Sequence, residues 1–391
     1  MSCSDCIVHQ IQSNTYLNGL DQTGSDADLP LAGSIELTLH CNLHCKHCYI
    51  RYDGATDNEM TTEEILAVLD KLGEAGVLFL LMTGGDILVR RDFKEIYLHA
   101  KKLGFLVTLY TNATLVTDDI ADFLVDYPPR RIEITIYGHT HDTYNEVTHS
   151  LHGFERFREG VQRLVDRNLP VHLKTMVLKS NEHEFEDIRR WAEEEMGLPF
   201  RFDAIVNPRL NGDQDVLEER IAPEAVARLQ YSDPKEIDSF QRLRQMAAQS
   251  GADGRLFKCG AGIKTVHVDP QGRMHPCMMW RATPYDFLHG DVAGWKAHVA
   301  ELRKNTAPAE TGCTKCQNRL ACGNCPATSL LETGVAGKNV DYYCQINKAR
   351  ERFFELRDDT PINEYRPMAG SKKGEQRNEK TRKRETAEAV Y

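Results

Sequence analysis

Short apolar runs alternate with amphipathic stretches between residues 34 and 207. Six apolar runs have the length of β-strands, and the segments between them repeat apolar residues with a helical period. Helix start signals support this reading at Thr61-Thr62-Glu63-Glu64 and at Thr117-Asp118-Asp119. The expected strands are 34–40, 77–82, 105–110, 131–137, 171–178 and 200–206, and the expected helices lie near 61–75, 91–103, 116–126, 153–168 and 183–196.

Six strand-helix repeats predict an α/β domain with a parallel sheet over residues 34–207, preceded by an N-terminal extension, 1–33. Such a sheet is either open or curled into a partial (β/α)6 barrel of the TIM type. In barrels of this kind, the active site gathers at the C-terminal ends of the strands. We therefore expect the chemistry of this chain at that edge of the sheet.

Beyond Pro208 the repeat weakens, and residues 208–258 are expected to form a helical connection. From Cys259 onward, cysteine, glycine and proline become frequent. This composition predicts a small module over 259–368 that bound metal stabilises more than a hydrophobic core does. Two helices, a strand and a turn are expected in these regions, at 218–228, 234–249, 265–269 and 270–272.

The formal net charge of −10 over 391 residues argues against nucleic-acid binding as the main activity, because it implies no broad basic surface. A dense basic run occurs only in the segment 369–391, where it is interleaved with glutamates. That segment reads as a disordered charged tail, with a partner-binding arm as the alternative. No apolar run is long enough to span a bilayer and the N-terminus lacks a secretion signal, so we expect a cytoplasmic protein without membrane contact.

The twelve cysteines are clustered, and in a reducing compartment clustered cysteines bind metal more often than they form disulfides. Cys41, Cys45 and Cys48 stand directly after the first expected strand. Three thiolates on a short loop can hold three irons of a [4Fe-4S] cluster and leave the fourth iron open for a ligand. A structural zinc site is the alternative, but no fourth cysteine is close in the sequence to complete it.

The spacing of Cys41, Cys45 and Cys48, followed by aromatic Tyr49, resembles the signature of the radical S-adenosylmethionine (radical SAM) superfamily. The resemblance implies that S-adenosylmethionine binds the open iron and is cleaved reductively to a 5′-deoxyadenosyl radical, which abstracts hydrogen from an unactivated carbon. The cofactor supplies this chemistry, and the protein supplies orientation and exclusion of water.

Other segments at strand ends resemble the cofactor-binding positions of that superfamily. Gly84-Gly85-Asp86 is similar to a motif that binds the methionine amino group, with aspartate in place of the usual glutamate. Asn112 and Thr135 are similar to positions that contact the ribose or the carboxylate, and His47 to one that flanks the adenine. Read without the resemblance, the two glycines are a turn, Asn112 and Thr135 are ordinary strand-end residues, and the histidines beside the loop are not metal ligands.

The later cysteines resemble the seven-cysteine SPASM module, which carries auxiliary [4Fe-4S] clusters in peptide- and protein-modifying radical enzymes. By that resemblance, one cluster is held by Cys313, Cys316, Cys322 and Cys344, and a second by Cys259, Cys277 and Cys325. One or two auxiliary clusters are therefore expected. A zinc knuckle formed by the four cysteines between 313 and 325 is the alternative.

Two departures from the SPASM pattern concern this second set of cysteines. Only two residues, Gly323 and Asn324, separate Cys322 from Cys325, where the pattern usually has three. Thr265 stands where sulfatase-maturing relatives have an extra cysteine. The cluster at Cys259 is thus open or takes a ligand from elsewhere, for which Cys3 and Cys6 are candidates.

Extra clusters can accept the electron that a substrate radical must lose, so the expected reaction is an oxidation. Peptide maturation is favoured by three segments that resemble SPASM proteins of ribosomal-peptide pathways: 136–144, 200–203 with 207–209, and 341–344. Alternatives are modification of a heme-type tetrapyrrole side chain, formylglycine formation in a sulfatase, and a non-catalytic iron-sulfur electron carrier. The formylglycine alternative is weakened because Met278, and not aspartate, follows Cys277.

Residues on and after the sixth strand are candidates for peptide contacts: Arg201, Asp203, Asn207 and Arg209. They could equally be a salt-bridged strand end. Tyr137 and Asp203 are the candidates for a catalytic acid or base. The expected partners are a peptide or protein substrate, a flavodoxin- or ferredoxin-type electron donor, and a separate peptide-recognition protein.

Overall fold

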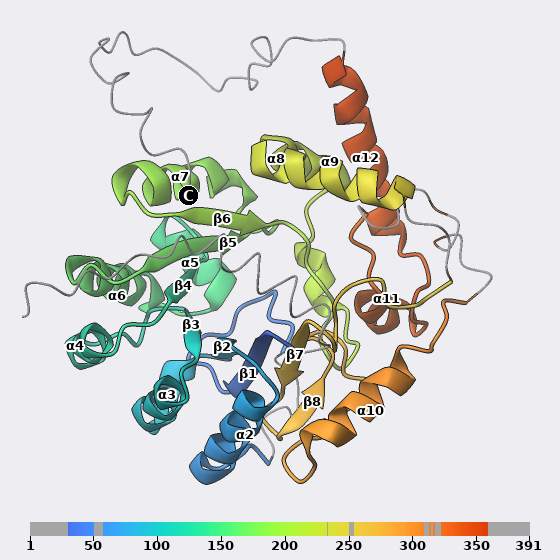
Figure 1. Cartoon of the computed structure of the whole chain (residues 1–391). Coiled ribbons are helices and arrows are strands. Elements are labelled where there is room, and N and C mark those ends of the chain that lie inside the picture. The colour runs from blue at the N-terminus through green and yellow to red at the C-terminus, as the bar shows by residue number, and fades with distance from the viewer. Residues whose placement is uncertain are drawn as a thin grey trace, which may run out of the picture.

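The structure, a computed structural model, describes residues 30–50, 58–232, 234–249, 254–308, 313, 316 and 322–358. The expected N-terminal extension with Cys3 and Cys6 lies almost entirely outside these residues, and the charged tail 369–391 lies wholly outside them. Figure 1 shows the chain coloured from its N-terminus to its C-terminus.

One continuous sheet of nine strands forms the centre of the described fold, in the order β6-β5-β4-β3-β2-β1-β7-β8-β9. Neighbours from β6 to β7 pair in parallel, and the last two pairs are antiparallel. Figure 1 shows the first six strands curling with helices on their outer side, which confirms the partial barrel. These strands are β1 Ala32–Thr38, β2 Phe79–Gly84, β3 Leu106–Thr111, β4 Arg131–Ile136, β5 Val171–Met176 and β6 Phe200–Asp203.

The helices of the barrel follow the predicted pattern closely. The capping box is present at the first helix, where Thr61 and Glu64 exchange side-chain to backbone hydrogen bonds, and Thr117 caps a later one. The helices are α2 Thr62–Glu74, α3 Phe93–Lys102, α4 Asp118–Asp126, α5 His141–Thr148, α6 Gly153–Asp166 and α7 Phe185–Arg190, the last continued by a π-helical turn over Trp191–Glu195.

Sequence reasoning missed helix α5. Its residues are mostly polar, so no apolar period announces it, and it begins because the Thr140 side chain accepts a hydrogen bond from the Thr143 amide. The inner side of α5 is nevertheless buried at Tyr144 and Val147. This helix matters for the site because the cysteine loop is docked on its C-terminal end.

The main hydrophobic core lies between the outer face of the sheet and the helices. Strand residues such as Ile35, Leu80, Leu109 and Ile134 pack there against helix residues such as Leu69. Alternate strand residues point the other way, toward the inside of the barrel. Several of those are polar and buried, including Glu36, Thr83 and Glu133.

The later part of the chain continues the barrel sheet. Strand β7, Thr265–Val268, pairs in parallel with β1, and β8, Arg273–His275, returns after the predicted turn, where the Gly272 amide donates to the Asp269 carbonyl at 3.0 Å. The sheet thus crosses the module boundary expected at residue 259. The remaining elements are the 3-10 helices η1 Ile87–Val89, η2 Glu182–Glu184 and η4 Asp215–Glu219, strand β9 Tyr285–Asp286, and helices α8 Pro223–Ser232, α9 Pro234–Gln249, α10 Val292–Leu302, α11 Pro326–Thr333 and α12 Asp341–Asp358.

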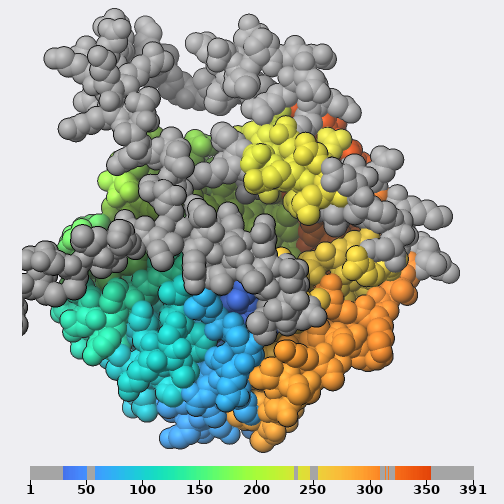
Figure 2. All heavy atoms as spheres, in the orientation of Figure 1, coloured from blue at the N-terminus to red at the C-terminus, as the bar shows by residue number. Residues whose placement is uncertain are grey.

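The two parts of the chain lie side by side in one body. Figures 1 and 2 both show the early barrel helices next to α10 and the segments around it. Lys71 of α2 donates to the carbonyl oxygens of Phe287, Leu288 and Gly290 at 2.7 to 3.0 Å. Across the described residues, no helix is long and apolar enough to cross a membrane.

Candidate active site

The loop with Cys41, Cys45 and Cys48 begins two residues after β1, at the C-terminal edge of the barrel sheet. Backbone hydrogen bonds attach it to the end of α5: His44 donates to Thr148 and Lys46 to Val147, both at 2.9 Å. The loop is therefore held on a rigid element, as a site for a cluster requires.

The other end of the loop is tied to the segment after β6. The Arg209 guanidinium donates to the Cys48 carbonyl at 2.7 Å and is itself paired with Asp215 at 2.8 Å. The sequence suggested Arg209 as a candidate peptide contact. The structure places its guanidinium against the backbone of Cys48. It orients the loop through the backbone.

The three thiols face a common space. Burial raises the pKa of Cys41 to about 11, and neighbouring Cys48 contributes to that rise. Burial also raises the pKa of Cys45 well above its ordinary range, with Cys48 and Cys41 as further causes. Three adjacent buried thiolates repel one another, so a bound cationic centre is what would stabilise them in that form. This donor set fits a [4Fe-4S] cluster with three protein ligands.

Gly84 and Gly85 lie against the backbone of the cysteine loop. A Cβ at Gly84 would be 2.0 Å from the Thr38 carbonyl oxygen, and one at Gly85 would be 2.1 Å from that of His40. Gly84 also has a φ of 132°, which disfavours any side chain. The glycines allow the end of β2 to approach the loop, and both also line the cavity described below.

The carboxylate of Asp86 lies in a buried hydrogen-bond network, and its predicted contact with the cofactor stays a prediction. We expected its carboxylate to bind the methionine amino group, but the side chain is fully buried and its oxygens are already occupied. One oxygen accepts from the Leu88 amide at 2.9 Å, and the other from the Thr111 hydroxyl and the Asn112 amide at 2.8 Å each. Asp86 thus joins the ends of β2 and β3, and the cofactor would meet the backbone of the glycines beside it.

Asn112 lies beside the cysteine loop, and its predicted contact with the ribose or carboxylate of the cofactor stays a prediction. Its amide nitrogen is 3.7 Å from the Cys41 sulfur and donates to Asn42 at 3.0 Å. Its amide oxygen accepts from the backbone and the hydroxyl of Thr114 at 2.9 and 2.5 Å. These bonds orient the side-chain NH2 toward the loop, so Asn112 is placed to support the first thiolate.

Tyr137 and His47 lie together beside Cys45. The two ring centres are 5.7 Å apart, and the Tyr137 hydroxyl is hydrogen-bonded to the Cys45 thiol, a bond that lowers the pKa of that thiol. Burial lowers the pKa of His47 to about 4, so the imidazole is neutral near pH 7. Tyr137 therefore contacts a cluster ligand, and its assignment as an acid or base stays a prediction.

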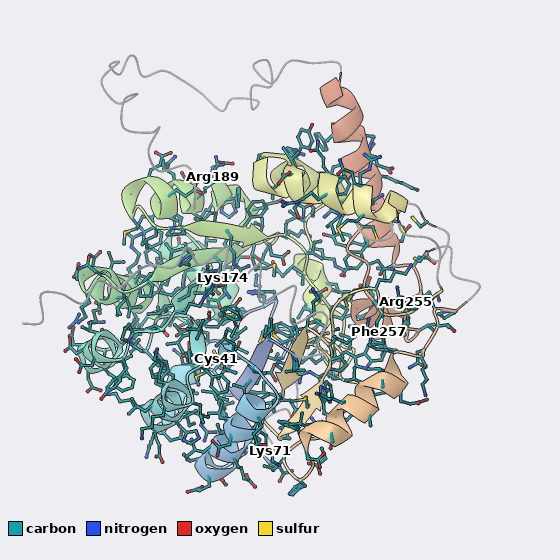
Figure 3. The ribbon with its side chains drawn as sticks, in the orientation of Figure 1. Cys41, Lys71, Lys174, Arg189, Arg255 and Phe257 are labelled. Carbon is teal, nitrogen blue, oxygen red and sulfur yellow. The ribbon has the colours of Figure 1, made fainter. Side chains whose placement is uncertain are left out.

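A cavity of about 720 Å3 opens over the loop. It is lined by the three cysteines, by Gly84 and Gly85, and by residues on or directly after strands β3 to β6, including Asn112 and Thr135. Met278 and Met279, which follow Cys277, close another part of its wall. Both parts of the chain thus shape one chamber. Figure 3 labels Cys41 and Lys174, both of which line it.

The candidates on and after β6 have different roles from one another. Arg201 and Asp203 line the cavity, as predicted. Burial raises the pKa of Asp203, whose carboxylate accepts from the Ile205 amide at 2.9 Å. Asn207 also lines the cavity, but its side-chain oxygen accepts from the Tyr343 hydroxyl at 2.9 Å, which joins the barrel to α12.

The cavity residues that the sequence did not single out include Tyr110, Lys174 and Met279. Tyr110 and Lys174 stand in strands where polar and apolar residues alternate, Leu-Val-Thr-Leu-Tyr-Thr and Val-His-Leu-Lys-Thr-Met. Alternation along the strand puts them on the inner face, and this was the signal available. Met279 carried no such signal, because its approach to the barrel depends on how β7 and β8 fold back against β1.

The described C-terminal cysteines sort into two groups. Cys322 interacts electrostatically with Cys313, Cys316 and Cys344, and with burial as the main cause its pKa rises to about 11. Cys277 interacts with Cys325 and Cys259, again with burial as the main cause of its raised pKa. These groups have the membership expected for two SPASM clusters.

The arrangement of the cysteines fits a single metal ion less well than it fits [4Fe-4S] clusters. Among the described residues, no three His, Cys, Asp or Glu side chains are arranged to hold one ion. The cysteines of a [4Fe-4S] cluster each bind a different iron, so they face one another across the cluster and do not converge on one point. The grouping of the thiols supports clusters, and the residue assignments stay proposals.

Comparison with known proteins identifies the class. The Radical SAM superfamily matches residues 35–192, which span the barrel from β1 to the helical turn after α7. Residues 35–192 of this chain are thus a Radical SAM domain, and the enzymes of that superfamily use a [4Fe-4S] cluster and S-adenosylmethionine.

Particular relatives lie in two functional groups. An AdoMet-dependent heme synthase of Methanosarcina barkeri is 25% identical over 324 residues, which are 76% of this chain and 92% of that protein. A PqqA peptide cyclase of Bradyrhizobium diazoefficiens is 25% identical over 390 residues, 89% of this chain and 96% of that protein. The solved structure of native anSMEcpe with bound AdoMet matches with a TM-score of 0.65 at 16% identity, covering 84% of this chain and 100% of that one, and so supports the fold.

Proposed function

We propose that this protein is a peptide maturase, in which a radical SAM barrel and a SPASM-like module together oxidise a side chain of a peptide or protein. One observation carries the proposal: the ten described cysteines lie in three groups. The first group, Cys41, Cys45 and Cys48, lines the same cavity as Met278 and Met279 of the C-terminal part. An electron leaving the substrate thus has acceptor sites on the same side of the barrel as the radical chemistry.

The residues that would hold the first cluster are Cys41, Cys45 and Cys48. When bound, this cluster and S-adenosylmethionine supply the hydrogen-abstracting radical. Gly84 and Gly85 present their backbone to the cofactor side of the cavity, and Thr135 lines the same wall. Asn112 and Tyr137 donate toward the thiolates of Cys41 and Cys45. The enclosing walls exclude water, which protects a radical from side reactions.

The cavity itself bears on the substrate class. The formylglycine alternative calls for an aspartate after Cys277, and the chamber is lined there by Met278 and Met279. A relative that covers 89% of this chain is a peptide cyclase, which agrees with a peptide substrate here. Peptide contacts are proposed for Arg201 and Asp203, which remain accessible from the cavity.

Anaerobic reconstitution tests the cluster assignment. About twelve irons per chain are expected for three four-iron clusters, and about four irons with one zinc would contradict the SPASM module. The reduced holoenzyme is expected to release 5′-deoxyadenosine slowly even without substrate. A protein that only carries electrons would release none, so this measurement separates the enzyme from the non-catalytic alternative.

Substrate identity is tested with short peptides encoded next to the gene. Each is incubated with the reduced holoenzyme and S-adenosylmethionine, and its mass is followed. Loss of two hydrogen atoms, matched by one 5′-deoxyadenosine, is the expected result. If no neighbouring peptide changes mass while a tetrapyrrole does, the peptide proposal is wrong.

Modification of a tetrapyrrole side chain is the second candidate function. The heme synthase of Methanosarcina barkeri supports it, because this chain covers 92% of that relative. Incubation with a tetrapyrrole carrying carboxylate side chains, followed by mass spectrometry, tests it beside the peptides. We further propose a flavodoxin- or ferredoxin-type electron donor, a separate peptide-recognition protein and a cytoplasmic location.

A further inference from the structure

Four polar side chains meet on the inner side of strands β3 to β6. Strand pairing places Tyr110 opposite Glu133 and Lys174 opposite Arg201. Tyr110, Lys174 and Arg201 line the cavity, and Glu133 contacts them from β4. Side chains that lie this close on neighbouring strands act as one electrostatic unit.

Glu133 is already neutralised within this unit. Its Oε2 accepts from Arg201 at 2.5 Å, and its Oε1 accepts from Arg131 at 3.3 Å. The Arg201 hydrogen bond and the nearby Lys174 charge lower the pKa of Glu133 to about 2, against the opposing effect of burial. One carboxylate is thus shared among several cations and has little capacity left for another.

Lys174 has the weakest anionic contact of these cations. Its Nζ is 3.6 Å from Glu133 Oε2, longer than the Arg201 hydrogen bond to the same atom. The ammonium group lies 3.0 Å from the centre of the Tyr110 ring, so part of its charge faces an aromatic surface. The side chain is only 17% exposed, and the space beside it is the cavity. A buried ammonium in this position favours an anionic partner.

Asp203 does not supply that partner. It lies two residues beyond Arg201 on β6, and its charge is an influence on Arg201. Its carboxylate already accepts a hydrogen bond from the Ile205 amide at 2.9 Å, and the contacts with Glu133 are made by Lys174 and Arg201. Lys174 and Arg201 therefore leave this wall of the cavity with positive charge to satisfy.

We propose that Lys174 and Arg201 form a subsite that binds a carboxylate group of the substrate inside the cavity. Ammonium and guanidinium donors make their strongest hydrogen bonds to such a group. For a peptide substrate, the inference means an aspartate, a glutamate or a C-terminal carboxylate close to the carbon that loses hydrogen. That second statement rests on the proposed function, whereas the carboxylate-binding property itself does not.

S-adenosylmethionine also carries a carboxylate, and the arrangement of the site favours the substrate as the source. Asp86, Asn112 and Tyr137 influence the thiols of Cys41 and Cys45, and a cation that contacts the loop is Arg209, which binds the Cys48 carbonyl. Lys174 and Arg201 lie on β5 and β6 and interact with Glu133 and with each other. They are thus part of the wall that continues away from the loop.

Protection of Lys174 from acylation tests the subsite directly. The reconstituted full-length protein is treated with acetic anhydride in the presence of S-adenosylmethionine, with either glutarate or its uncharged analogue glutaramide added. Acetylation of each lysine is then measured by mass spectrometry. We expect glutarate, but not glutaramide, to slow acetylation of Lys174 at least about threefold, in line with a charge-assisted hydrogen bond. Lys94, an exposed residue on α3, is the internal control and should react equally in all samples.

Equal protection of Lys174 by glutarate and glutaramide would contradict the subsite. If S-adenosylmethionine alone protects Lys174 fully and glutarate adds nothing, the carboxylate belongs to the cofactor and the substrate assignment is overturned. Neither outcome depends on finding a peptide, so a failure of the proposed function is seen separately.

A substrate peptide, once found, allows a second test of the carboxylate subsite. Replacing its acidic residues one at a time by the amide is expected to raise KM about tenfold at one position. The difference in KM between the acidic peptide and its amide should disappear in Lys174→Met and persist in Lys174→Arg. The control variant Lys94→Met should show the same difference as the unchanged protein. An amide series that leaves KM unchanged at every acidic position, with the C-terminus amidated as well, contradicts the inference for the peptide.

Discussion

Arg281 donates to Glu36 Oε1 at 2.8 Å and so joins the C-terminal part of the chain to the first strand of the barrel. Glu36 is 1% exposed and Arg281 14% exposed. His267 of β7 is the other partner near the carboxylate, at 3.5 Å. Arg281 follows Cys277 by four residues, so this ion pair sets the position of a proposed cluster ligand relative to the barrel.

Removing Arg281 should therefore destabilise the protein strongly. Arg281→Met leaves the Glu36 carboxylate buried without its main partner, which typically costs about 3 to 5 kcal/mol. Denaturant unfolding of the reconstituted protein measures the loss. The double variant Arg281→Met with Glu36→Gln should recover part of it, because no buried charge is left. A single variant as stable as the original chain would show that the pair does not join the two parts.

Gly84→Ala should prevent normal loading of the first cluster. The new Cβ would meet the Thr38 carbonyl oxygen at 2.0 Å, at a φ that side chains disfavour. The backbone between β2 and the cysteine loop must then move apart. We expect a loss of about four irons per chain after reconstitution. Gly104→Ala is a matched control, since Gly104 also has positive φ but no atom within 4 Å of its Cβ position. If both variants load equally, close approach is not what Gly84 provides.

Asp86→Glu distinguishes the buried role from the predicted cofactor contact. If the carboxylate bound the methionine amino group, glutamate would restore the usual motif and improve S-adenosylmethionine affinity. Because Asp86 is fully buried and holds Leu88, Thr111 and Asn112, the added methylene should instead cost about 1 to 3 kcal/mol of stability. Thermal unfolding together with cofactor affinity decides between the two roles.

Single cysteine variants should separate the two auxiliary groups. Cys322→Ser is expected to remove the cluster shared with Cys313, Cys316 and Cys344, and Cys277→Ser the one shared with Cys259 and Cys325. Each variant should lose about four irons while the first cluster still supports 5′-deoxyadenosine formation. The double variant should lose about eight. A single variant that loses both clusters would contradict the division into two groups.

Carboxylate recognition by Lys174 should weaken as pH rises through neutrality. Burial lowers the pKa of Lys174 to about 7, so the ammonium form dominates below that pH and the neutral amine above it. Two facing groups, Glu133 and Tyr110, do not titrate there, because the pKa of Glu133 is lowered to about 2 and that of Tyr110 is raised to about 12. The ratio of KM for the amide and acid peptides should therefore fall between about pH 6 and about pH 9. Lys174→Arg should abolish the fall.

The lowered pKa of Lys174 also makes the free energy of unfolding depend on pH. The direction of this dependence follows from how many protons the folded and unfolded states bind. The unfolded lysine binds its proton with an ordinary pKa near 10.5, whereas the folded one does so only near 7. Stability is therefore lost as pH falls from about 10 to about 7, and the loss levels off below that range. Lys174→Met should flatten this part of the curve, and Lys94→Met should not.

Some of the site could be read from local sequence. The cysteine spacing identified the cluster loop, and the apolar periods placed all six barrel strands within a few residues of their observed bounds. Helix α5 escaped notice because polar residues and a Thr140 cap, and no apolar period, define it. The hydrogen bonds of Asp86 to Leu88, Thr111 and Asn112 could not be predicted, because the motif says which residue follows the glycines but not which way its side chain turns.

The sequence by itself determined the order of strands and helices and the position of the first cysteine loop, because these depend on spacing along the chain. The grouping of the later cysteines is implied by the SPASM resemblance and stays a proposal. Tertiary structure alone decided that β7 pairs with β1, that Arg209 holds the Cys48 carbonyl, and that Lys174, Arg201 and Glu133 meet beside the cavity. These contacts join segments far apart in the sequence, and strand register and burial set them. Local periodicity contains no information about either.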